Sequence, residues 1–204
     1  MHMENYSEKI KRILELAHES GIMSSAEVRS QGIHHEYLRQ LCREGELMRV
    51  GRGLYSLPDA DVTLHHGLAQ ALKAIPKGVI CLLSALRFHE IGTQAPHEVW
   101  VAIDRRAARP RVKYPRTRIM RFSGKSLTEG IDKHNVEGVP VRIYNPAKTV
   151  ADCFKYRNKI GLDVALEALR EAIRERRCTT DELWRYAKIC RVTRIMRPYM
   201  EAIV

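Results

Sequence analysis

The first third of the chain carries apolar residues at the three- and four-residue spacing of amphipathic helices. Residues 6–20 form the first of these patterns. A second pattern spans residues 33–45, where Leu38 and Leu41 share one face and Gly45 supplies the backbone freedom that a helix C-terminus requires. The spacing therefore predicts two longer helices in this part of the chain.

A third, shorter helix is predicted between these two. Ser24 is a good N-cap residue, and Glu27 stands three positions later, which is the spacing of a capping box. Gly32 then marks a turn before the next helix, because glycine adopts positive φ angles without strain. The order of a short helix, a glycine turn and a second helix is typical of a helix-turn-helix.

After residue 45, the apolar positions follow the pattern of a β-hairpin. Leu47 and Val50 lie on one predicted arm, Leu54 and Leu57 lie on the other, and 51–53 is the Gly-Arg-Gly turn between them. Three helices and a basic hairpin predict a winged helix-turn-helix over residues 1–58. A small helical subdomain with a hairpin of no DNA-binding role is the alternative.

This interpretation assigns DNA contacts to the polar face of the second helix and to the hairpin. The helix would enter the major groove, and the arginine at the hairpin tip would follow the backbone or the minor groove. The expected DNA-binding residues are His34, His35, Arg39, Gln40, Arg43, Arg49 and Arg52.

The rest of the chain mixes helical and strand patterns, so the predicted class is α+β. We place the domain boundary after Pro58, with a mixed α/β domain over residues 59–204; the Asp-Ala-Asp run at 59–61 is interpreted as a helix N-cap rather than a pair of catalytic carboxylates. Helices are expected at 62–74, 79–91, 162–177, from Thr179 onward and around 195–204, and strands at 98–103, 118–122, 131–136 and 139–144. Asn145 and Pro146 are good N-cap and first-turn residues for a further helix.

The positive net charge of the protein also indicates a nucleic-acid partner. The net charge is +11, but residues 1–58 contain eight basic and eight acidic side chains, so the excess lies in residues 59–204. Nine lysines and arginines lie between positions 105 and 125 with no acidic residue among them. We expect Arg105, Arg106, Arg109 and Arg111 to contact DNA phosphates; a solvated loop is the alternative.

Motifs for catalysis or metal binding are weak. Gly124-Lys125-Ser126 is similar to the end of a phosphate-binding loop, but Ile119 stands where that loop needs glycine. The adjacent histidine pairs lack metal-ligand spacing, and the five cysteines form no Cys-x-x-Cys pair. We therefore expect no catalytic residue, no metal and no cofactor. Without an apolar run long enough to cross a membrane and without a signal-peptide pattern, a cytoplasmic protein that does not bind membranes is expected.

Three segments together resemble the AbiEi family of type IV antitoxins, which act as transcriptional regulators. Residues 51–58 (GRGLYSLP) resemble the family's wing, and residues 82–92 (LLSALRFHEIG) and 145–152 (NPAKTVAD) resemble two later motifs in the same order. Glu90 and Ala147 depart from the usual residues, which are a small residue and a glutamate.

The resemblance implies a repressor that binds inverted repeats in its own operator. It also implies an antitoxin that counters a nucleotidyltransferase toxin without a stable complex, and it places Lys148, Thr149 and Asp152 on an antitoxin surface; a structural role for these three is the alternative. Two other hypotheses remain: a nucleic-acid-processing enzyme targeted by the winged helix, and a regulator that has lost its toxin.

Overall fold

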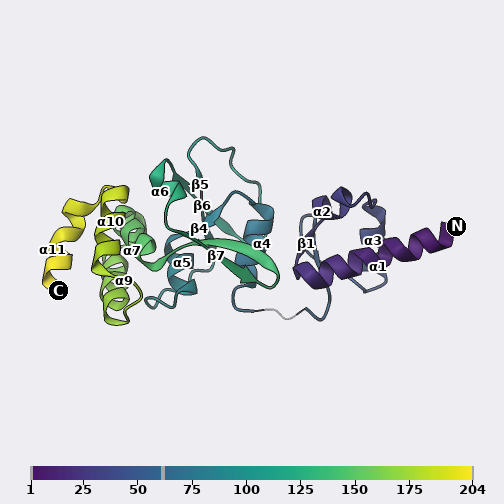
Figure 1. Ribbon diagram of the computed structural model, residues 1–204, viewed down its shortest axis with the longest axis horizontal. Coiled ribbons are helices and arrows are strands. Elements are labelled where there is room, and N and C mark those ends of the chain that lie inside the picture. The colour runs from purple at the N-terminus through teal and green to yellow at the C-terminus, as the bar shows by residue number, and fades with distance from the viewer. Residues whose placement is uncertain (1, 61–62, 204) are drawn as a thin grey trace. The chain divides into compact units, whose positions relative to one another are not determined.

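The computed structural model describes residues 2–60 and 63–203 (Figure 1). Contacts between residues group the chain into two units. The first unit comprises Met1–Pro76, Pro110–Arg116 and Asn135–Val141, and the second comprises Lys77–Arg109, Thr117–His134 and Arg142–Val204. Helices and β-sheets both occur, which confirms the α+β class.

The N-terminal part of the first unit contains helices and a small antiparallel sheet. Its elements are α1 (His2–Ser20), β1 (Met23–Ser24), α2 (Ser25–Ser30), α3 (Glu36–Arg43), β2 (Met48–Gly51) and β3 (Leu54–Ser56), followed by α4 (His66–Ala74). The strand order is β1-β3-β2. The sequence pattern missed β1, because a two-residue strand is too short to show an alternation of apolar and polar residues.

Apolar side chains from α1, α2, α3 and the sheet form one core in this unit. Its fully buried members are Ile13, Ala17, Met23, Val28, Ile33, Leu38, Leu41 and Leu47. Ile13 and Ala17 of α1, and Leu38 and Leu41 of α3, belong to the helical patterns from which those two helices were predicted. Burying that stripe stabilises helices that are too short to persist alone in water.

The remaining elements are built around a five-stranded sheet. They are β4 (Val79–Ile80), α5 (Leu82–Phe88), β5 (Val99–Asp104), β6 (Thr117–Phe122), α6 (Lys125–Thr128), β7 (Ile131–Val136), β8 (Val139–Tyr144), α7 (Pro146–Lys155), α8 (Arg157–Ile160), α9 (Leu162–Arg174), α10 (Thr180–Cys190) and α11 (Thr193–Ile203). The strand order is β6-β5-β4-β8-β7. β5 is parallel to β6 and antiparallel to β4, and β4 is parallel to β8.

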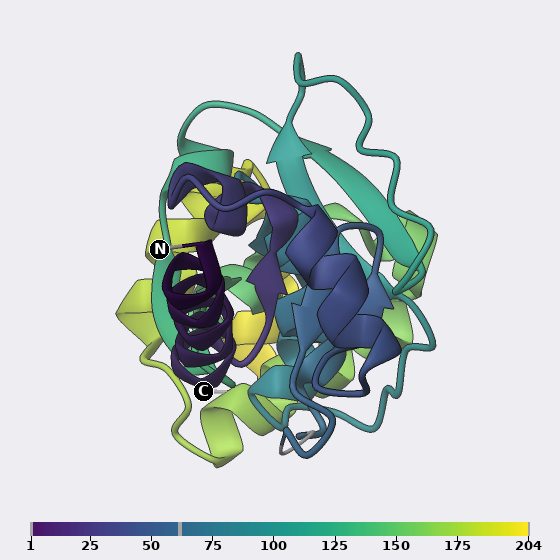
Figure 2. The same cartoon turned by 90° about the vertical axis from the view of Figure 1, so that its right-hand side faces the viewer.

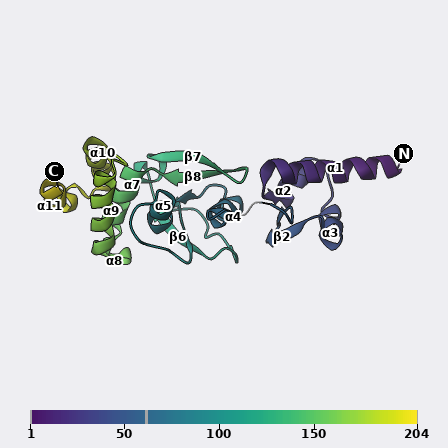
Figure 3. The same cartoon turned by 90° about the horizontal axis from the view of Figure 1, so that it is seen from below.

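Helix α7 is the central helix of the second unit. All of its residues from Ala147 to Phe154 are buried, and it packs against α5, α9, α10 and α11. Figures 1 and 3 show α9 and α10 beside α7, and β7 beside β8. The connection between β5 and β6 contains no helix or strand and appears as a teal loop in Figure 2.

The structure corrects two predicted helices. The helix expected at 79–91 begins only at Leu82, because Val79 and Ile80 are β-branched residues that pair in the sheet and Cys81 is extended. The last helix, expected around 195–204, begins at Thr193 and contains Pro198 in its interior. Met196 and Met200 are buried one turn apart, and this packing offsets the hydrogen bond that proline removes.

Two further helices had no prediction. Both α6 and α8 have four residues, which is about one turn and too short for an apolar period. The helices predicted from Asn145 and from Thr179 are confirmed. Asn145 accepts a hydrogen bond from the backbone of Lys148, and Thr179 forms a capping box with Glu182.

Candidate nucleic-acid interface

The capping box predicted at the start of α2 is present. The backbone N–H of Glu27 donates to Ser24 Oγ at 3.2 Å, and the backbone N–H of Ser24 donates to Glu27 Oε2 at 2.7 Å. Gly32 follows α2 with a φ of +72°, where a side chain would be strained. Ile33 is then buried and anchors the start of the segment that leads into α3.

Helix α3 has one buried face and one charged face. Leu38 and Leu41 are 0% and 1% exposed, whereas Glu36, Arg39 and Arg43 are all exposed. The apolar face fixes the rotation of the helix, because turning it would expose both leucines to water. The rotation therefore presents the two arginines to solvent.

A single carboxylate holds both arginines of α3. Arg39 Nη1 lies 3.2 Å from Glu36 Oε2, and Arg43 Nη2 lies 3.4 Å from Glu36 Oε1. The Gln40 amide donates to Glu44 Oε1 at 2.8 Å. Exposed ion pairs such as these contribute at most about 1 kcal/mol each, so a phosphate or a base edge can replace the carboxylate at small cost.

The β2–β3 hairpin is fixed against the start of α2. Ser25 N donates to Gly53 O at 2.8 Å, and β1 pairs with β3 so that Met23 lies opposite Tyr55. Gly53 has a φ of +70°, and a Cβ there would lie 2.9 Å from Ser25 Oγ. The second glycine of the turn is therefore required both for its backbone angle and for its close approach to α2.

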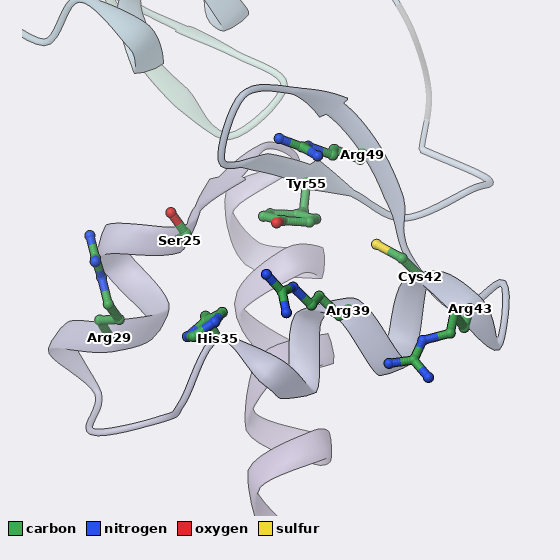
Figure 4. A pocket seen from close by; sticks show the side chains of 8 residues that line it. All are labelled: Ser25, Arg29, His35, Arg39, Cys42, Arg43, Arg49 and Tyr55. Carbon is green, nitrogen blue, oxygen red and sulfur yellow. The ribbon is translucent and has the colours of Figure 1, made fainter.

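A hollow of about 620 Å³ lies between α2, α3 and the hairpin (Figure 4). Its lining residues are Ser25, Arg29, His35, Arg39, Cys42, Arg43, Arg49 and Tyr55. Figure 4 shows the Tyr55 ring between Arg49 and Arg39. No carboxylate is among the described residues that line the hollow, so it is a positively charged concavity.

The thiol in this hollow is not a nucleophile. Burial raises the pKa of Cys42, and the positive charge of Arg49 only partly opposes that increase. The thiol is therefore protonated near neutral pH, and the thiolate is the reactive form. The arginines of the hollow give it the chemistry of an anion-binding surface.

The structure brings four of the expected DNA-binding residues together. His35, Arg39, Arg43 and Arg49 line the hollow, and Arg49 Nε also donates to Gly51 O at 3.2 Å. The remaining three, His34, Gln40 and Arg52, lie outside it.

Gln40 lies on α3, whereas His34 precedes that helix and Arg52 lies in the turn between β2 and β3. The His34 ring lies 4.3 Å from the His35 ring, centroid to centroid, and Arg52 is exposed in the turn of the hairpin. The sequence missed Arg29 and Tyr55. A basic residue in the last turn of α2 was the available signal for Arg29. Tyr55 gave none, since it alternates like any strand residue.

The four expected phosphate contacts beyond residue 58 are all exposed. Arg105 and Arg106 line a second hollow with Asp104, Ser123 and Gly124. Arg109 and Arg111 are exposed in the loop between β5 and β6. Their exposure leaves all four guanidinium groups accessible to solvent anions.

The assignment of Lys148, Thr149 and Asp152 to a surface is wrong, because each of them is 0% exposed. Lys148 Nζ is paired with the Asp152 carboxylate and lies 4.0 Å from the centroid of the Tyr144 ring. Thr149 Oγ1 donates to Tyr144 O at 3.0 Å. Cys190 Sγ–H donates to the second Asp152 oxygen at 3.2 Å. The three side chains are parts of the core of the second unit.

The surroundings of Asp152 in this cluster change the pKa of its carboxyl group. Burial raises the pKa of Asp152 above its ordinary value, while the charge and hydrogen bond of Lys148 oppose that increase. A buried ion pair of this kind needs both partners, because either charge alone would be uncompensated in a medium of low polarity. Lys148 and Asp152 therefore act as one structural unit.

Among residues 2–60 and 63–203, no group of three or more histidine, cysteine, aspartate and glutamate side chains is arranged to hold a metal ion. Within the same ranges, no helix has the length and apolar character needed to cross a membrane.

Comparison with known proteins identifies one family. The family described as transcriptional regulator, AbiEi antitoxin, matches residues 11–58, which contain α2, α3 and the hairpin. The resemblance is thus confirmed for this segment, while the resembling segments at 82–92 and 145–152 lie outside the match. No curated protein matches the chain.

Comparison with solved structures extends over more of the chain. The crystal structure of the RV2827C protein from Mycobacterium tuberculosis is similar, with a TM-score of 0.59 and 11% sequence identity. The similarity covers 88% of this chain and 71% of that chain. At this identity it shows a shared fold and nothing about shared function.

Proposed function

We propose that the protein is a DNA-binding transcriptional regulator in which residues 1–58 form a winged helix-turn-helix domain. The observation that carries the proposal is the hollow of α2, α3 and the hairpin, where Arg29, Arg39, Arg43 and Arg49 gather without a lining carboxylate. A DNA backbone presents phosphates to such a surface, and each neutralised phosphate releases counterions. The family match over residues 11–58 supports the same function.

Residues on and just before α3 make the base contacts in this proposal. Arg39, Gln40 and Arg43 lie on its outward face and read base edges in the major groove, where arginine forms bidentate contacts with guanine. His34 and His35, at the start of this helix, contact DNA beside them. Release from Glu36 accompanies binding, because that carboxylate otherwise occupies both guanidinium groups.

The hairpin serves as the wing. Arg52 in its turn contacts the backbone or the minor groove, and Arg49 contacts a phosphate beside α3. Arg105, Arg106 and Arg109 of the second unit, together with Arg111 of the segment Pro110–Arg116 of the first unit, add phosphate contacts that do not depend on sequence. This agrees with the concentration of the +11 charge after residue 58.

The proposed target is a pair of inverted repeats in the operator of the protein's own gene. We propose in addition that the protein is a cytoplasmic antitoxin against a nucleotidyltransferase toxin, with which it forms no stable complex. Lys148, Thr149 and Asp152 contribute to this activity by holding the second unit together, since they are buried. The family match supports this role in general terms.

A footprint on the DNA upstream of the gene tests the DNA-binding proposal. Full-length protein should protect two inverted repeats, and a variant with Arg39, Arg43 and Arg49 all changed to alanine should protect neither while retaining its thermal midpoint. A footprint that survives in the triple variant would contradict the assignment of the interface. Metal-dependent cleavage of the probe by purified protein would favour the enzyme hypothesis instead.

A further inference from the structure

A third hollow, which is also basic, lies entirely within the second unit and has no role in the proposed function. It encloses about 870 Å³ between the start of α6, the α7–α8 junction and the end of α10. Five of its lining residues are basic: Lys125, Lys155, Arg157, Lys188 and Arg191. No acidic residue is among its described lining residues. Segments far apart in the sequence thus bring positive charge to one concavity.

Lys155 is the most constrained of these cations. It is half-buried, and its Nζ donates to Ser126 Oγ at 3.1 Å, while Ser126 Oγ donates to Ile189 O at 3.3 Å. The same Nζ lies 5.7 Å and 5.9 Å from the ring centroids of Phe122 and Tyr156. No carboxylate of the described residues is paired with it by a salt bridge. The charge of Lys155 acts on the buried Asp152 carboxylate, but that carboxylate is already paired with Lys148. The partly desolvated ammonium group of Lys155 can therefore still accept an incoming anion.

Arg191 adds a second independent observation. It follows α10 with a φ of +60°, in the left-handed region where glycine is the usual residue. Its side chain is exposed and lines the hollow. Lys188 and Arg191 also stabilise the C-terminus of α10 through the helix dipole. Stabilisation of α10 does not explain why Lys125 and Arg157 also line the hollow, because these two residues belong to α6 and α8.

The hollow also has an apolar wall and an open loop. Ile189, Val192 and Ile195 line it on the side of α10 and α11. A Cβ built on Gly124 would meet no heavy atom within 4 Å, so a ligand can approach the backbone there. Cations beside an apolar wall match a ligand with phosphate at one end and a flat apolar base at the other. The volume also lies within the range of roughly 300–1,000 Å³ that is typical of small-ligand sites.

We propose that this hollow binds a phosphorylated nucleotide unit, either a free nucleoside triphosphate or the terminal nucleotide of a single strand. Lys155 and Arg191 hold the phosphates, and Ile189 and Ile195 pack against the base. Gly124-Lys125-Ser126 takes part only as an open loop beside the phosphates and not as a P-loop, because Ile119 replaces its required glycine and α6 has four residues. Ser123 and Gly124 line both this hollow and the hollow of Arg105 and Arg106, but no residue proposed above to contact DNA lines this one.

The chain offers a matched pair of variants for a test. Arg176 also has a positive φ, of +52°, two residues after the end of α9, and it is exposed and not among the residues that line the hollow. R191G and R176G each remove one positive charge and place glycine where its backbone angle is preferred. Both variants should therefore have thermal midpoints close to that of the unchanged protein.

The experiment measures displacement of a fluorescent ATP analogue from full-length protein at low ionic strength. Competitors are ATP, a 5′-phosphorylated single-stranded oligonucleotide, inorganic tripolyphosphate and a DNA duplex. R191G and K155Q should weaken binding by about tenfold, since each removes a charge-assisted contact, whereas R176G should bind like the unchanged protein. Competition by ATP alone identifies a free nucleotide, and competition by the single strand alone identifies a strand end.

Other outcomes would overturn the proposal. Equal weakening in R191G and R176G would show attraction by net charge, and no weakening in R191G and K155Q would place the ligand elsewhere. Tripolyphosphate or duplex competing as well as ATP and the single strand would show that the apolar wall plays no part. Operator footprinting of the same variants separates this result from the DNA-binding proposal, because none of these residues belongs to that interface.

Discussion

Helices α3 and α7 carry charged pairs at similar spacing in opposite surroundings. On α3, Arg39 and Glu36 are three residues apart, lie 3.2 Å from each other and have side chains that are 64% and 51% exposed. On α7, Lys148 and Asp152 are four residues apart, and both side chains are 0% exposed. The sequence alone gives the two pairs the same appearance.

The difference decides what each pair can do. The α3 arginines remain in water, so they can exchange Glu36 for another anion at small cost. The α7 lysine is buried, and among the described residues its charge is compensated by Asp152 and by the faces of aromatic rings. Exposed pairs are therefore available to a partner, whereas the buried pair stabilises the fold. The predictions below test this contrast, beginning with the largest effect.

Removal of the buried lysine should produce the largest loss of stability. Lys148→Ala leaves the Asp152 carboxylate uncompensated in the core, and we expect the free energy of unfolding to fall by about 3–5 kcal/mol. Urea denaturation measures this change. Arg39→Ala is the matched control on α3 and should cost at most about 1 kcal/mol. Equal losses in the two variants would show that burial does not distinguish the pairs.

Charge reversal in the β5–β6 loop should produce the next largest effect, which is a loss of DNA affinity. Arg109→Glu combined with Arg111→Glu replaces two proposed phosphate contacts with repulsion, so affinity should fall more than tenfold and the salt dependence should become shallower. Gel-shift titration over a range of salt concentrations measures both quantities. Unchanged affinity and slope would identify this stretch as a solvated loop.

The outward face of α3 should govern sequence preference. Arg43→Ala should reduce the preference for operator over random DNA by about 1–3 kcal/mol while leaving the fold intact, because the side chain is 75% exposed. Competition between operator and random duplexes gives the ratio. If binding to both duplexes weakened equally, Arg43 would be a phosphate contact.

The tip of the hairpin should affect all sequences alike. Arg52→Ala removes one proposed backbone contact, so operator and random DNA should both bind more weakly and the salt slope should fall by about one unit. The same gel-shift titration provides the slope. A slope equal to that of the unchanged protein would remove the hairpin turn from the interface.

The smallest effect is expected at the carboxylate that holds the α3 arginines. Glu36→Gln should change the free energy of unfolding by at most about 1 kcal/mol. It should raise affinity for random DNA a few-fold, because it removes a negative charge that competes with phosphate for Arg39 and Arg43. Denaturation and random-duplex titration measure the two effects. Weaker binding to random DNA would show that Glu36 positions the arginines instead.

The sequence determined the features of this protein that depend on neighbouring residues. Two helix starts were predicted from pairs of capping residues, Ser24 with Glu27 and Thr179 with Glu182. The apolar spacing of α3 determined which face of that helix carries Arg39 and Arg43. Caps and amphipathic stripes act within one or two turns, so their residues suffice to predict them. The tertiary structure decided the rest.

Features that depend on distant residues could not be obtained in this way. Val79 and Ile80 form a strand because β5 and β8 lie beside them, and α11 continues through Pro198 because two methionines pack into the core. Lys148 is buried because α7 is covered by helices from several parts of the chain. Burial depends on packing partners that are distant in sequence, and these partners alone decide whether a charged residue contacts water or the core.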